Sequence, residues 1–192
     1  VQVNQHEVKV NLGIDEVHTL KDLGIKVPSP IDTRYQWSGK HKPFAHQKTT
    51  SAFLTMNRKA FCFNEQGTGK TASAIWAADF LLQQGKARRV LVICPLSIMD
   101  SAWRGDLETF APHRSVDVAY GPAKKRKAII EQGADFVIIN YDGVHIVSES
   151  IASGGFDIII VDEATHYKNV STKRWKTLCR LVTDKTWLWL MT

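Results

Sequence analysis

The sequence is poor in the residues and runs that mark several classes of protein. Its 192 residues include only 6 prolines and 12 glycines, which excludes collagen-like and low-complexity chains. The longest apolar runs, such as Ile158–Val161, have the length of a strand and fall far short of the roughly 18 residues that would span a bilayer. The sequence therefore predicts a folded globular chain with no membrane segment.

Cysteine and metal-binding patterns are also scarce. The 3 cysteines, Cys62, Cys94 and Cys179, lie far apart and form no C-x-x-C pair, which argues against a zinc or redox site. The 7 histidines show no spacing such as H-E-x-x-H, and no nucleophile-elbow motif places a Ser/His/Asp set. We expect buried thiols in a reducing compartment.

Positive charge exceeds negative charge. Lys and Arg number 25 against 19 Asp and Glu, which gives a formal net charge of +6. Such a balance favours a polyanionic partner without identifying one, and an inert basic surface is the plain alternative.

The first part of the chain, residues 1–43, differs from the rest. Apolar residues alternate between Val1 and Leu12 as they do in short strands, and residues 15–24 have helical spacing. Prolines at 28 and 30 then interrupt regular structure. Because some forty residues are too few for a core of their own, we expect this N-terminal extension to pack on a main domain over residues 44–192.

In the main domain, short apolar runs alternate with helix-sized segments, which predicts an α/β fold with a parallel sheet and helices on both faces. The expected strands are Ala60–Phe63, Val90–Cys94, Val116–Tyr120, Phe136–Asn140, Ile158–Val161 and Thr186–Met191. The expected helices are His46–Met56, Thr71–Gln83, Met99–Phe110, Ala123–Glu131 and Lys173–Val182. In such folds ligands bind at the carboxyl ends of the strands.

A glycine-rich segment follows the first of these strands and precedes a helix. The strict phosphate-loop pattern G-x-x-x-x-G-K-[ST] would place Gly at position 64, where Asn64 stands. In this context backbone N–H groups can surround phosphate oxygens, Lys70 can reach the β- and γ-phosphates, and the Thr71 hydroxyl can hold Mg²⁺. An ordinary strand-to-helix turn is the alternative. The predicted ATP-binding residues here are Gly67, Thr68, Gly69, Lys70 and Thr71.

Two carboxylates end the buried run Ile158–Val161. Asp162 can hold the Mg²⁺ that bridges the phosphates, and Glu163 can polarise the attacking water. Alone the pair is equally typical of acidic residues that cap a strand. With the phosphate loop, it predicts nucleoside triphosphate hydrolysis with Lys70, Asp162 and Glu163 as catalytic residues.

These motifs resemble the first motor lobe of helicase superfamily two, and most closely the Swi/Snf-type double-stranded DNA translocases, over roughly residues 43–192. The segment Asp162–Asn169 is similar to the Asp-Glu-x-His-x-x-Lys-Asn signature of that subfamily. The resemblance implies a RecA-like fold, ATP and Mg²⁺ as ligands, and a Gln47 that reads the adenine edge. Thr165 stands where the family has the His that couples ATP chemistry to movement, and in a regular backbone the neighbouring His166 would point elsewhere.

Further motifs imply contacts with a nucleic-acid backbone. The segment that ends in Pro95-Leu96-Ser97, with Trp103 following, is similar to the family's Pro-Leu-Ser motif. Asn140-Tyr141-Asp142 is similar to a later motif of the family. For each, an ordinary loop or core residue is the plain alternative. A basic run begins a predicted helix, where such a run is more often a solvated helix face. The predicted nucleic-acid contacts are Pro95, Leu96, Ser97, Lys124, Lys125, Arg126, Lys127, Asn140 and Tyr141.

The end of the chain resembles the strand that enters the family's Thr-Gly-Thr-Pro motif, of which only Thr192 is present. The second RecA-like lobe, which in this family supplies arginine fingers worth about 10³–10⁵ in turnover, is therefore absent from this sequence. We expect a monomeric fragment that binds nucleotide weakly and hydrolyses it very slowly.

The resulting prediction is the ATP-binding lobe of a DNA translocase or helicase, cytoplasmic or associated with the nucleoid, with duplex DNA as partner. Three alternatives stay open at this point. The protein could act on RNA or single strands, it could be an idle nucleic-acid-binding or interaction module, or it could be a small-molecule P-loop kinase. The motifs between Lys70 and Asp162 weigh against the kinase.

Overall fold

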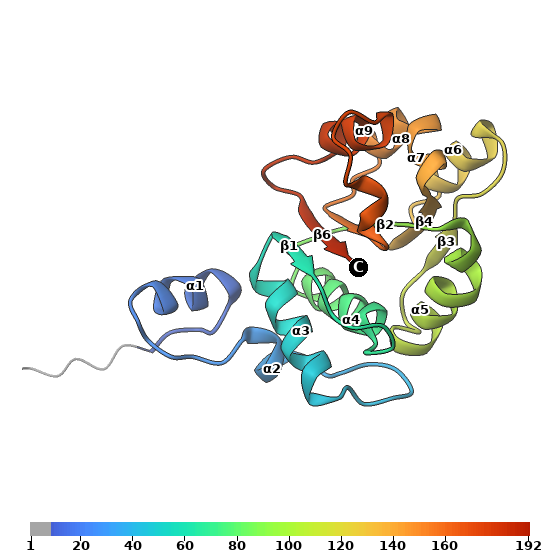
Figure 1. Ribbon diagram of the computed structural model, residues 1–192. Coiled ribbons are helices and arrows are strands. Elements are labelled where there is room, and N and C mark those ends of the chain that lie inside the picture. The colour runs from blue at the N-terminus through green and yellow to red at the C-terminus, as the bar shows by residue number, and fades with distance from the viewer. Residues whose placement is uncertain (1–8) are drawn as a thin grey trace, which may run out of the picture.

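The structure is a computed structural model that describes residues 9–192. Within that range, six parallel strands form one sheet with the order β1-β6-β5-β2-β4-β3. Figure 1 shows β1 and β6 toward one side of this sheet and β4 and β3 toward the other. The strands are β1 (Lys59–Cys62), β2 (Val90–Cys94), β3 (Val116–Val118), β4 (Phe136–Asn140), β5 (Ile158–Val161) and β6 (Trp187–Met191). The predicted parallel α/β fold is confirmed, and each expected strand is present with small shifts at its ends.

The sheet is covered on both faces, which explains its continuously apolar strands. Every residue of β2 and of β5 is buried. Alternate residues of these strands contribute to two separate core clusters, so that Val92 and Ile160 lie in one cluster whereas Ile93 and Val161 lie in the other. A strand that is buried on both faces is apolar at every position and does not alternate between apolar and polar residues, as in other parallel sheets.

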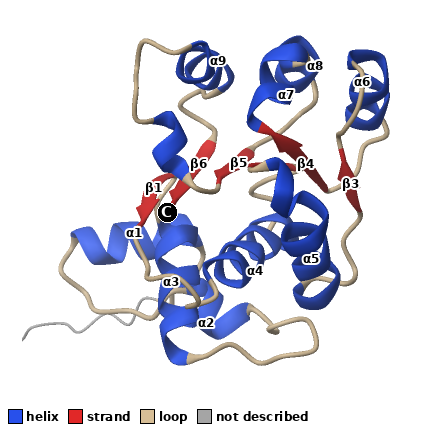
Figure 2. Ribbon diagram, turned by 45° about the vertical axis from the view of Figure 1, so that its right-hand side comes forward, coloured by secondary structure: helices blue, strands red, loops and turns tan. Residues whose placement is uncertain are grey.

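Helices pack against each face of the sheet. One layer holds α3 (Ala45–Met56), α4 (Lys70–Gln83) and α5 (Gly105–Phe110), and the other holds α6 (Ala123–Glu131), α7 (Tyr141–Ile146), α8 (Ser148–Ser153) and α9 (Lys173–Leu181), as Figure 2 shows. The helices expected around α3, α4, α6 and α9 are confirmed to within one residue at each end. The helices α7 and α8 were not predicted.

One expected helix, Met99–Phe110, is divided in the structure. A 3₁₀ turn over Leu96–Ile98 and a π-helical segment over Met99–Arg104 precede α5. A π-helical turn is wider than an α-helical turn and is frequent at functional sites. Here it carries the fully buried Trp103, so its geometry bears on the site described below.

The N-terminal extension packs on the main domain. Its helices are α1 (Ile14–Asp22), which confirms the expected helical spacing, and the unpredicted α2 (Pro30–Arg34). Ile14, Val17 and Ile31 are buried in the same core cluster as one face of the sheet. The strand expected up to Leu12 is wrong for residues 9–13, which have no regular structure, and its part before residue 9 lies outside the described residues.

No helix in the described part of the chain is both long and apolar enough to cross a membrane.

Candidate nucleotide-binding site

The glycine-rich segment forms a tight loop between β1 and the start of α4. Gly67 and Gly69 have φ values of 77° and 76°, in the left-handed region that glycine adopts at no steric cost. Lys70, the first residue of α4, folds back over the loop, and its Nζ donates to the carbonyl oxygens of Asn64 at 2.8 Å and Glu65 at 3.1 Å. The ammonium group therefore lies within the ring that the loop backbone forms.

Asn64 replaces the first glycine of the phosphate-loop pattern without strain. Among residues 9–192, Glu163 is the one non-glycine residue with a positive φ, so position 64 does not need the left-handed conformation that would require glycine. The Asn64 side chain donates from Nδ2 to the Thr50 hydroxyl at 2.9 Å, which anchors the loop to α3. The departure from the pattern is thus compatible with a phosphate loop.

Gln47 braces the same loop. It is 8% exposed, its Oε1 accepts from the Phe44 backbone N–H at 2.9 Å, and its Nε2 donates to the Thr68 carbonyl at 3.2 Å. A Cβ on Gly69 would come within 2.1 Å of that Nε2. The predicted adenine-reading amide therefore holds the N-terminus of α3 against the loop with both of its polar ends.

The acidic pair follows β5 directly. Asp162 is 9% exposed, and its two carboxylate oxygens accept from the Trp103 indole N–H at 2.8 Å and from the Glu163 backbone N–H at 3.0 Å. Glu163 is exposed and has a φ of 50°. The chain turns sharply here, because a left-handed residue lies between the strand and the 3₁₀ turn Ala164–Tyr167.

Tyr141 supports this turn from behind. Its hydroxyl donates to the Asp162 carbonyl oxygen at 2.5 Å, and the Glu163 carbonyl lies 3.5 Å away. The side chain is 7% exposed. Burial and the nearby Asp162 raise the pKa of the Tyr141 phenol far above its usual value, so the hydroxyl stays protonated and remains a donor.

The sheet brings the phosphate loop and the acidic pair to one edge. The last residue of β1, Cys62, pairs with Met191 of β6, and the last residue of β5, Val161, pairs with Leu190 of the same strand. Neighbouring strands are about 4.8 Å apart, so the two motifs leave the sheet about 10 Å from each other across β6. This separation suits groups that act on opposite sides of one phosphate chain.

The residues available for a cation fit Mg²⁺ held partly by the nucleotide. The half-buried Thr71 follows Lys70, and Asp162 is the acidic residue opposite. Residues 9–192 contain no group of three His, Cys, Asp or Glu side chains that would form an all-protein metal cage. Mg²⁺ commonly takes one or two protein ligands together with phosphate oxygens and waters, which is the arrangement these residues allow.

The predicted nucleic-acid residues divide into exposed and internal ones. Leu96 and Ser97 are exposed and Pro95 is half-buried, directly after β2. Asn140 is half-buried, and its Oδ1 accepts from Arg126 at 2.9 Å. Tyr141 is 7% exposed where it lines a groove, and its hydroxyl bonds to Asp162, so its direct contact with nucleic acid stays a prediction.

The four residues of the basic run at the start of α6 likewise differ in exposure. Arg126 is 5% exposed, and its guanidinium donates to the carbonyls of Gly121 and Ala119 as well as to Asn140, so the prediction of a phosphate contact is corrected for this residue. Lys124, Lys125 and Lys127 are exposed. The helix turns one of the four side chains inward, where it ties the loop after β3 to the end of β4.

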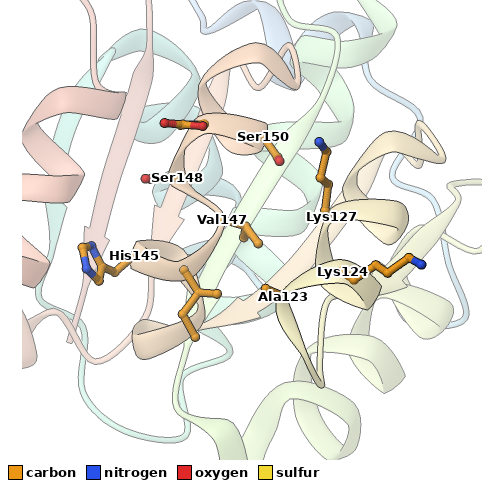
Figure 3. Close-up of a pocket in the computed structure, with 9 residues that line it drawn as sticks. Ala123, Lys124, Lys127, His145, Val147, Ser148 and Ser150 are labelled. Atoms are coloured by element: carbon orange, nitrogen blue, oxygen red, sulfur yellow. The ribbon is translucent and has the colours of Figure 1, made fainter.

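Two of these lysines line a groove. Lys124 and Lys127 lie on one side of a groove of about 420 Å³, opposite Ser148 and Ser150, as Figure 3 shows. His145 and Glu149 also line it. Lys125 does not, and its side chain folds over Gly121 instead.

The parallel sheet, the phosphate loop and the acidic pair together define a P-loop nucleotide-binding domain of RecA-like architecture. Residues 45–191 match the SNF2-related domain, and the chain belongs to that family.

The chain is similar to parts of larger proteins. YwqA of Bacillus subtilis, provisionally named an ATP-dependent helicase/translocase, is 31% identical over 122 residues, which are 62% of this chain and 13% of that protein. The ATP-dependent helicase fft2 of Schizosaccharomyces pombe is 29% identical over 129 residues, which are 62% of this chain and 10% of that protein. The chain thus spans a small part of the length of these curated relatives.

A solved structure shares the fold. The SWI2/SNF2 ATPase core of Sulfolobus solfataricus in complex with dsDNA matches with a TM-score of 0.72 and 22% identity, over 81% of this chain and 33% of that chain. The RecA-like fold is therefore shown.

Sequence reasoning found the two motifs but missed how the second one is held. Trp103 and Tyr141 were singled out only as nucleic-acid motif residues, and the structure places both against Asp162. The one feature of the sequence that could have indicated these contacts is that Trp103 and Tyr141 each come after an apolar strand, on the side of the sheet where Asp162 also lies.

Proposed function

We propose that this chain is the ATP-binding lobe of an ATP-dependent DNA translocase or helicase. The observation that carries this proposal is the placement of the phosphate loop and the acidic pair at one edge of a parallel sheet. The loop that ends at Lys70 follows β1, Asp162 follows β5, and the two strands end about 10 Å apart across β6 by strand spacing. Membership of the SNF2-related family and relatives named as ATP-dependent helicases support it. A DNA partner would locate the protein in the cytoplasm or on the nucleoid.

In this proposal each side chain has a stated task. The loop backbone at Gly67–Gly69 and the Lys70 ammonium bind the phosphates, because inward N–H groups and a positive charge attract anionic oxygens. Thr71 and Asp162 would hold Mg²⁺, which offsets the charge that develops during phosphoryl transfer. Glu163, exposed beside Asp162, orients the attacking water. Gln47 keeps one amide hydrogen beyond its bond to Thr68, and this hydrogen is available to adenine.

Turnover requires a second lobe in this proposal. A lobe that closes over the nucleotide would supply arginines worth about 10³–10⁵ in rate. We therefore expect the 192-residue chain to bind ATP and hydrolyse it very slowly. A protein that carries both lobes should turn over ATP faster with duplex DNA than with RNA or single strands.

Replacing Lys70 by Ala should weaken binding of ATP about ten- to a hundredfold. The Lys70 ammonium makes charge-assisted hydrogen bonds to the phosphates in this proposal, and such bonds contribute about 1.5–3 kcal/mol each. Titration calorimetry with a non-hydrolysable ATP analogue measures the effect. Lys48→Ala is the matched control, because Lys48 is an exposed lysine on α3 that lies over the Trp37 ring and away from the loop. Equal affinities for wild type and Lys70→Ala would contradict the proposal.

DNA binding is proposed to use the groove beside α6. Its lysines face hydroxyl groups of Ser148 and Ser150, a combination of charge and donors that suits backbone phosphates. The segment Pro95–Ser97, of which Leu96 and Ser97 are exposed, adds polar backbone groups after β2. Contacts of this kind recognise phosphates without reading sequence, as a translocase requires.

A double variant, Lys124→Ala with Lys127→Ala, should reduce the salt dependence of DNA binding. Each phosphate neutralised contributes about 0.9 to the slope of log K against log salt concentration, so losing two contacts lowers the slope by about 1.8. Fluorescence anisotropy with a short duplex over a salt series measures this slope. Lys125→Ala removes one charge from the same helix outside the groove and should leave the slope nearly unchanged. An unchanged slope in the double variant would remove the groove from the proposal.

A second candidate, an idle binding module, rests on one residue. Thr165 stands at the position of the family's coupling histidine. This candidate would be favoured if ATP binds but a two-lobe protein shows no stimulation of turnover by any nucleic acid.

A further inference from the structure

The acidic pair is held from behind by two buried aromatic side chains from other elements. We propose that Trp103 and Tyr141 are positioning residues that fix Asp162 and Glu163 for Mg²⁺-dependent nucleotide binding, and that His166 contacts this support through the Tyr141 ring. This assignment rests on the proposed function and adds residues to the same site. Neither aromatic residue needs to touch the nucleotide.

Trp103 fixes the Asp162 carboxylate. The indole is completely buried, and its N–H donates to Asp162 Oδ2 at 2.8 Å. A buried indole packed on all sides has little rotational freedom, so the hydrogen bond restrains the carboxylate to one orientation. Carboxylates that bind metals commonly have such outer partners, and losing the partner costs about ten- to a hundredfold in metal affinity.

Tyr141 fixes the backbone of the turn. Glu163 has a φ of 50°, a left-handed conformation that is strained for a non-glycine residue. The Tyr141 hydroxyl bonds to the Asp162 carbonyl that precedes this residue, at 2.5 Å, and the Glu163 carbonyl that follows lies 3.5 Å away. The phenol therefore stabilises the strained conformation that aims the Glu163 side chain.

His166 packs against this support. Because the backbone at Glu163 is left-handed, the segment after it does not continue the strand, and the His166 ring lies 4.9 Å from the Tyr141 ring. The Arg174 guanidinium lies 5.5 Å from the same ring and pairs with Asp142 at 2.7 Å. The exposed His166 and the guanidinium of Arg174 thus contact the ring whose hydroxyl holds the acidic pair, although Thr165 stands at the position of the family's histidine.

These residues also line an open groove. Its volume is about 500 Å³, and its lining residues include Tyr141, His166 and Arg174. A group bound in this groove would touch the Tyr141 ring, one hydrogen bond away from the Asp162 backbone. The support is thus accessible from the surface, which distinguishes it from an ordinary core contact.

The test compares nucleotide binding with and without Mg²⁺. We expect Trp103→Phe and Tyr141→Phe each to reduce the Mg²⁺-dependent gain in affinity for a non-hydrolysable ATP analogue by about tenfold or more, with the affinity measured in EDTA unchanged. His166→Ala should reduce the same gain by a smaller factor, because it removes only a ring contact. Titration calorimetry on the 192-residue chain in MgCl₂ and in EDTA gives both affinities.

Two matched variants separate positioning from general packing. Trp76→Phe removes the indole N–H of another buried tryptophan, whose partner is the Ser38 carbonyl at 2.9 Å. Tyr167→Phe removes a hydroxyl from a buried tyrosine in the same aromatic cluster, 5.7 Å from Tyr141. Both should leave the Mg²⁺-dependent gain at the wild-type value.

The outcomes are distinguishable. Equal losses in MgCl₂ and EDTA, or equal losses in the matched variants, would overturn the positioning roles while the proposed function stands. A wild-type chain that binds the analogue no better with Mg²⁺ than without it would overturn the proposed magnesium site, and the positioning roles with it.

Discussion

Replacing Asp79 by Ala should lower the free energy of unfolding by about 3–5 kcal/mol. Asp79 lies in α4, is completely buried, and accepts hydrogen bonds from Tyr35 Oη at 2.6 Å and Arg114 Nε at 2.7 Å. His113 Nε2 lies 3.0 Å from Asp79 Oδ1, and Gln83 Nε2 donates to Asp79 Oδ2 at 3.0 Å. Removing the carboxylate leaves the Arg114 Nε–H without its acceptor and leaves the Tyr35 hydroxyl with the Ser38 hydroxyl alone, and an unsatisfied buried donor is expensive.

The carboxylate also connects the N-terminal extension to the nucleotide site. Tyr35 and Ser38 precede the main domain, whereas α4 begins with Lys70 in the phosphate loop. The Trp76 indole on the same helix donates to the Ser38 carbonyl at 2.9 Å. We therefore propose that residues 30–43 are held to the main domain as part of one folding unit, in line with the expectation that the extension packs on that domain.

Urea denaturation followed by tryptophan fluorescence measures the effect of Asp79→Ala. Asp79→Asn should fall between the wild type and Ala, because the amide keeps one acceptor oxygen of the same shape. Asp15→Ala is the matched control: Asp15 pairs with Lys86 at 2.7 Å on the surface, and such exposed pairs contribute at most about 1 kcal/mol. If Asp79→Ala and Asp15→Ala lowered the free energy of unfolding equally, the buried Asp79 cluster would stabilise the fold no more than a surface ion pair does.

The central sheet could be predicted from composition along the chain. Runs such as Val90–Cys94 and Ile158–Val161 are apolar at every position, and only a strand covered on both faces uses such a run over so short a length. The short helices α7 and α8 could not be predicted in this way. Each has 6 residues, which form less than two turns and show no helical periodicity.

The two motifs of the site were also predictable, because each is local. The loop needs glycines, a lysine and a threonine in consecutive positions, and the acidic pair needs only to follow a strand. Their supporting contacts are not local. Trp103 and Asp162 are 59 residues apart, and their meeting depends on the π-helical segment after β2 and on the pairing of β2 with β5.

Two expectations depended on local backbone geometry that the sequence does not specify. The four basic residues at 124–127 are equivalent in sequence, but a helix turns about 100° per residue, so one of them, Arg126, faces the sheet. The expectation that His166 points elsewhere was tied to a regular backbone, and the positive φ of Glu163 changes the direction of the chain just before it.

Replacing Gly69 by Ala should weaken binding of MgATP by about a hundredfold or more. The residue has a φ of 76°, which costs an L-amino acid about 1–2 kcal/mol. The added Cβ would also come within 2.1 Å of Gln47 Nε2, so that amide must move and give up its bonds to Phe44 and Thr68. Each lost hydrogen bond contributes about 0.5–1.5 kcal/mol, and about 1.4 kcal/mol corresponds to a tenfold change in affinity.

Gly67→Ala separates the two effects. Gly67 has nearly the same φ, 77°, but no heavy atom would lie within 4 Å of its Cβ. Only the backbone effect remains, so the expected loss of affinity is about five- to thirtyfold. Calorimetric titrations of both variants with the non-hydrolysable analogue and MgCl₂ give the comparison directly.

A double variant tests whether the additional loss in Gly69→Ala comes from Gln47. Truncation of Gln47 to Ala in the Gly69→Ala background removes the clash and should recover affinity toward the level of Gly67→Ala, whereas the same truncation in wild type removes a brace and should weaken binding. A change of sign of this kind is a coupling between two residues in contact, which independent sites do not show. Additive losses would mean that Gln47 acts on the nucleotide without acting through the loop, and the bracing role drawn from its bond to Thr68 would then be wrong.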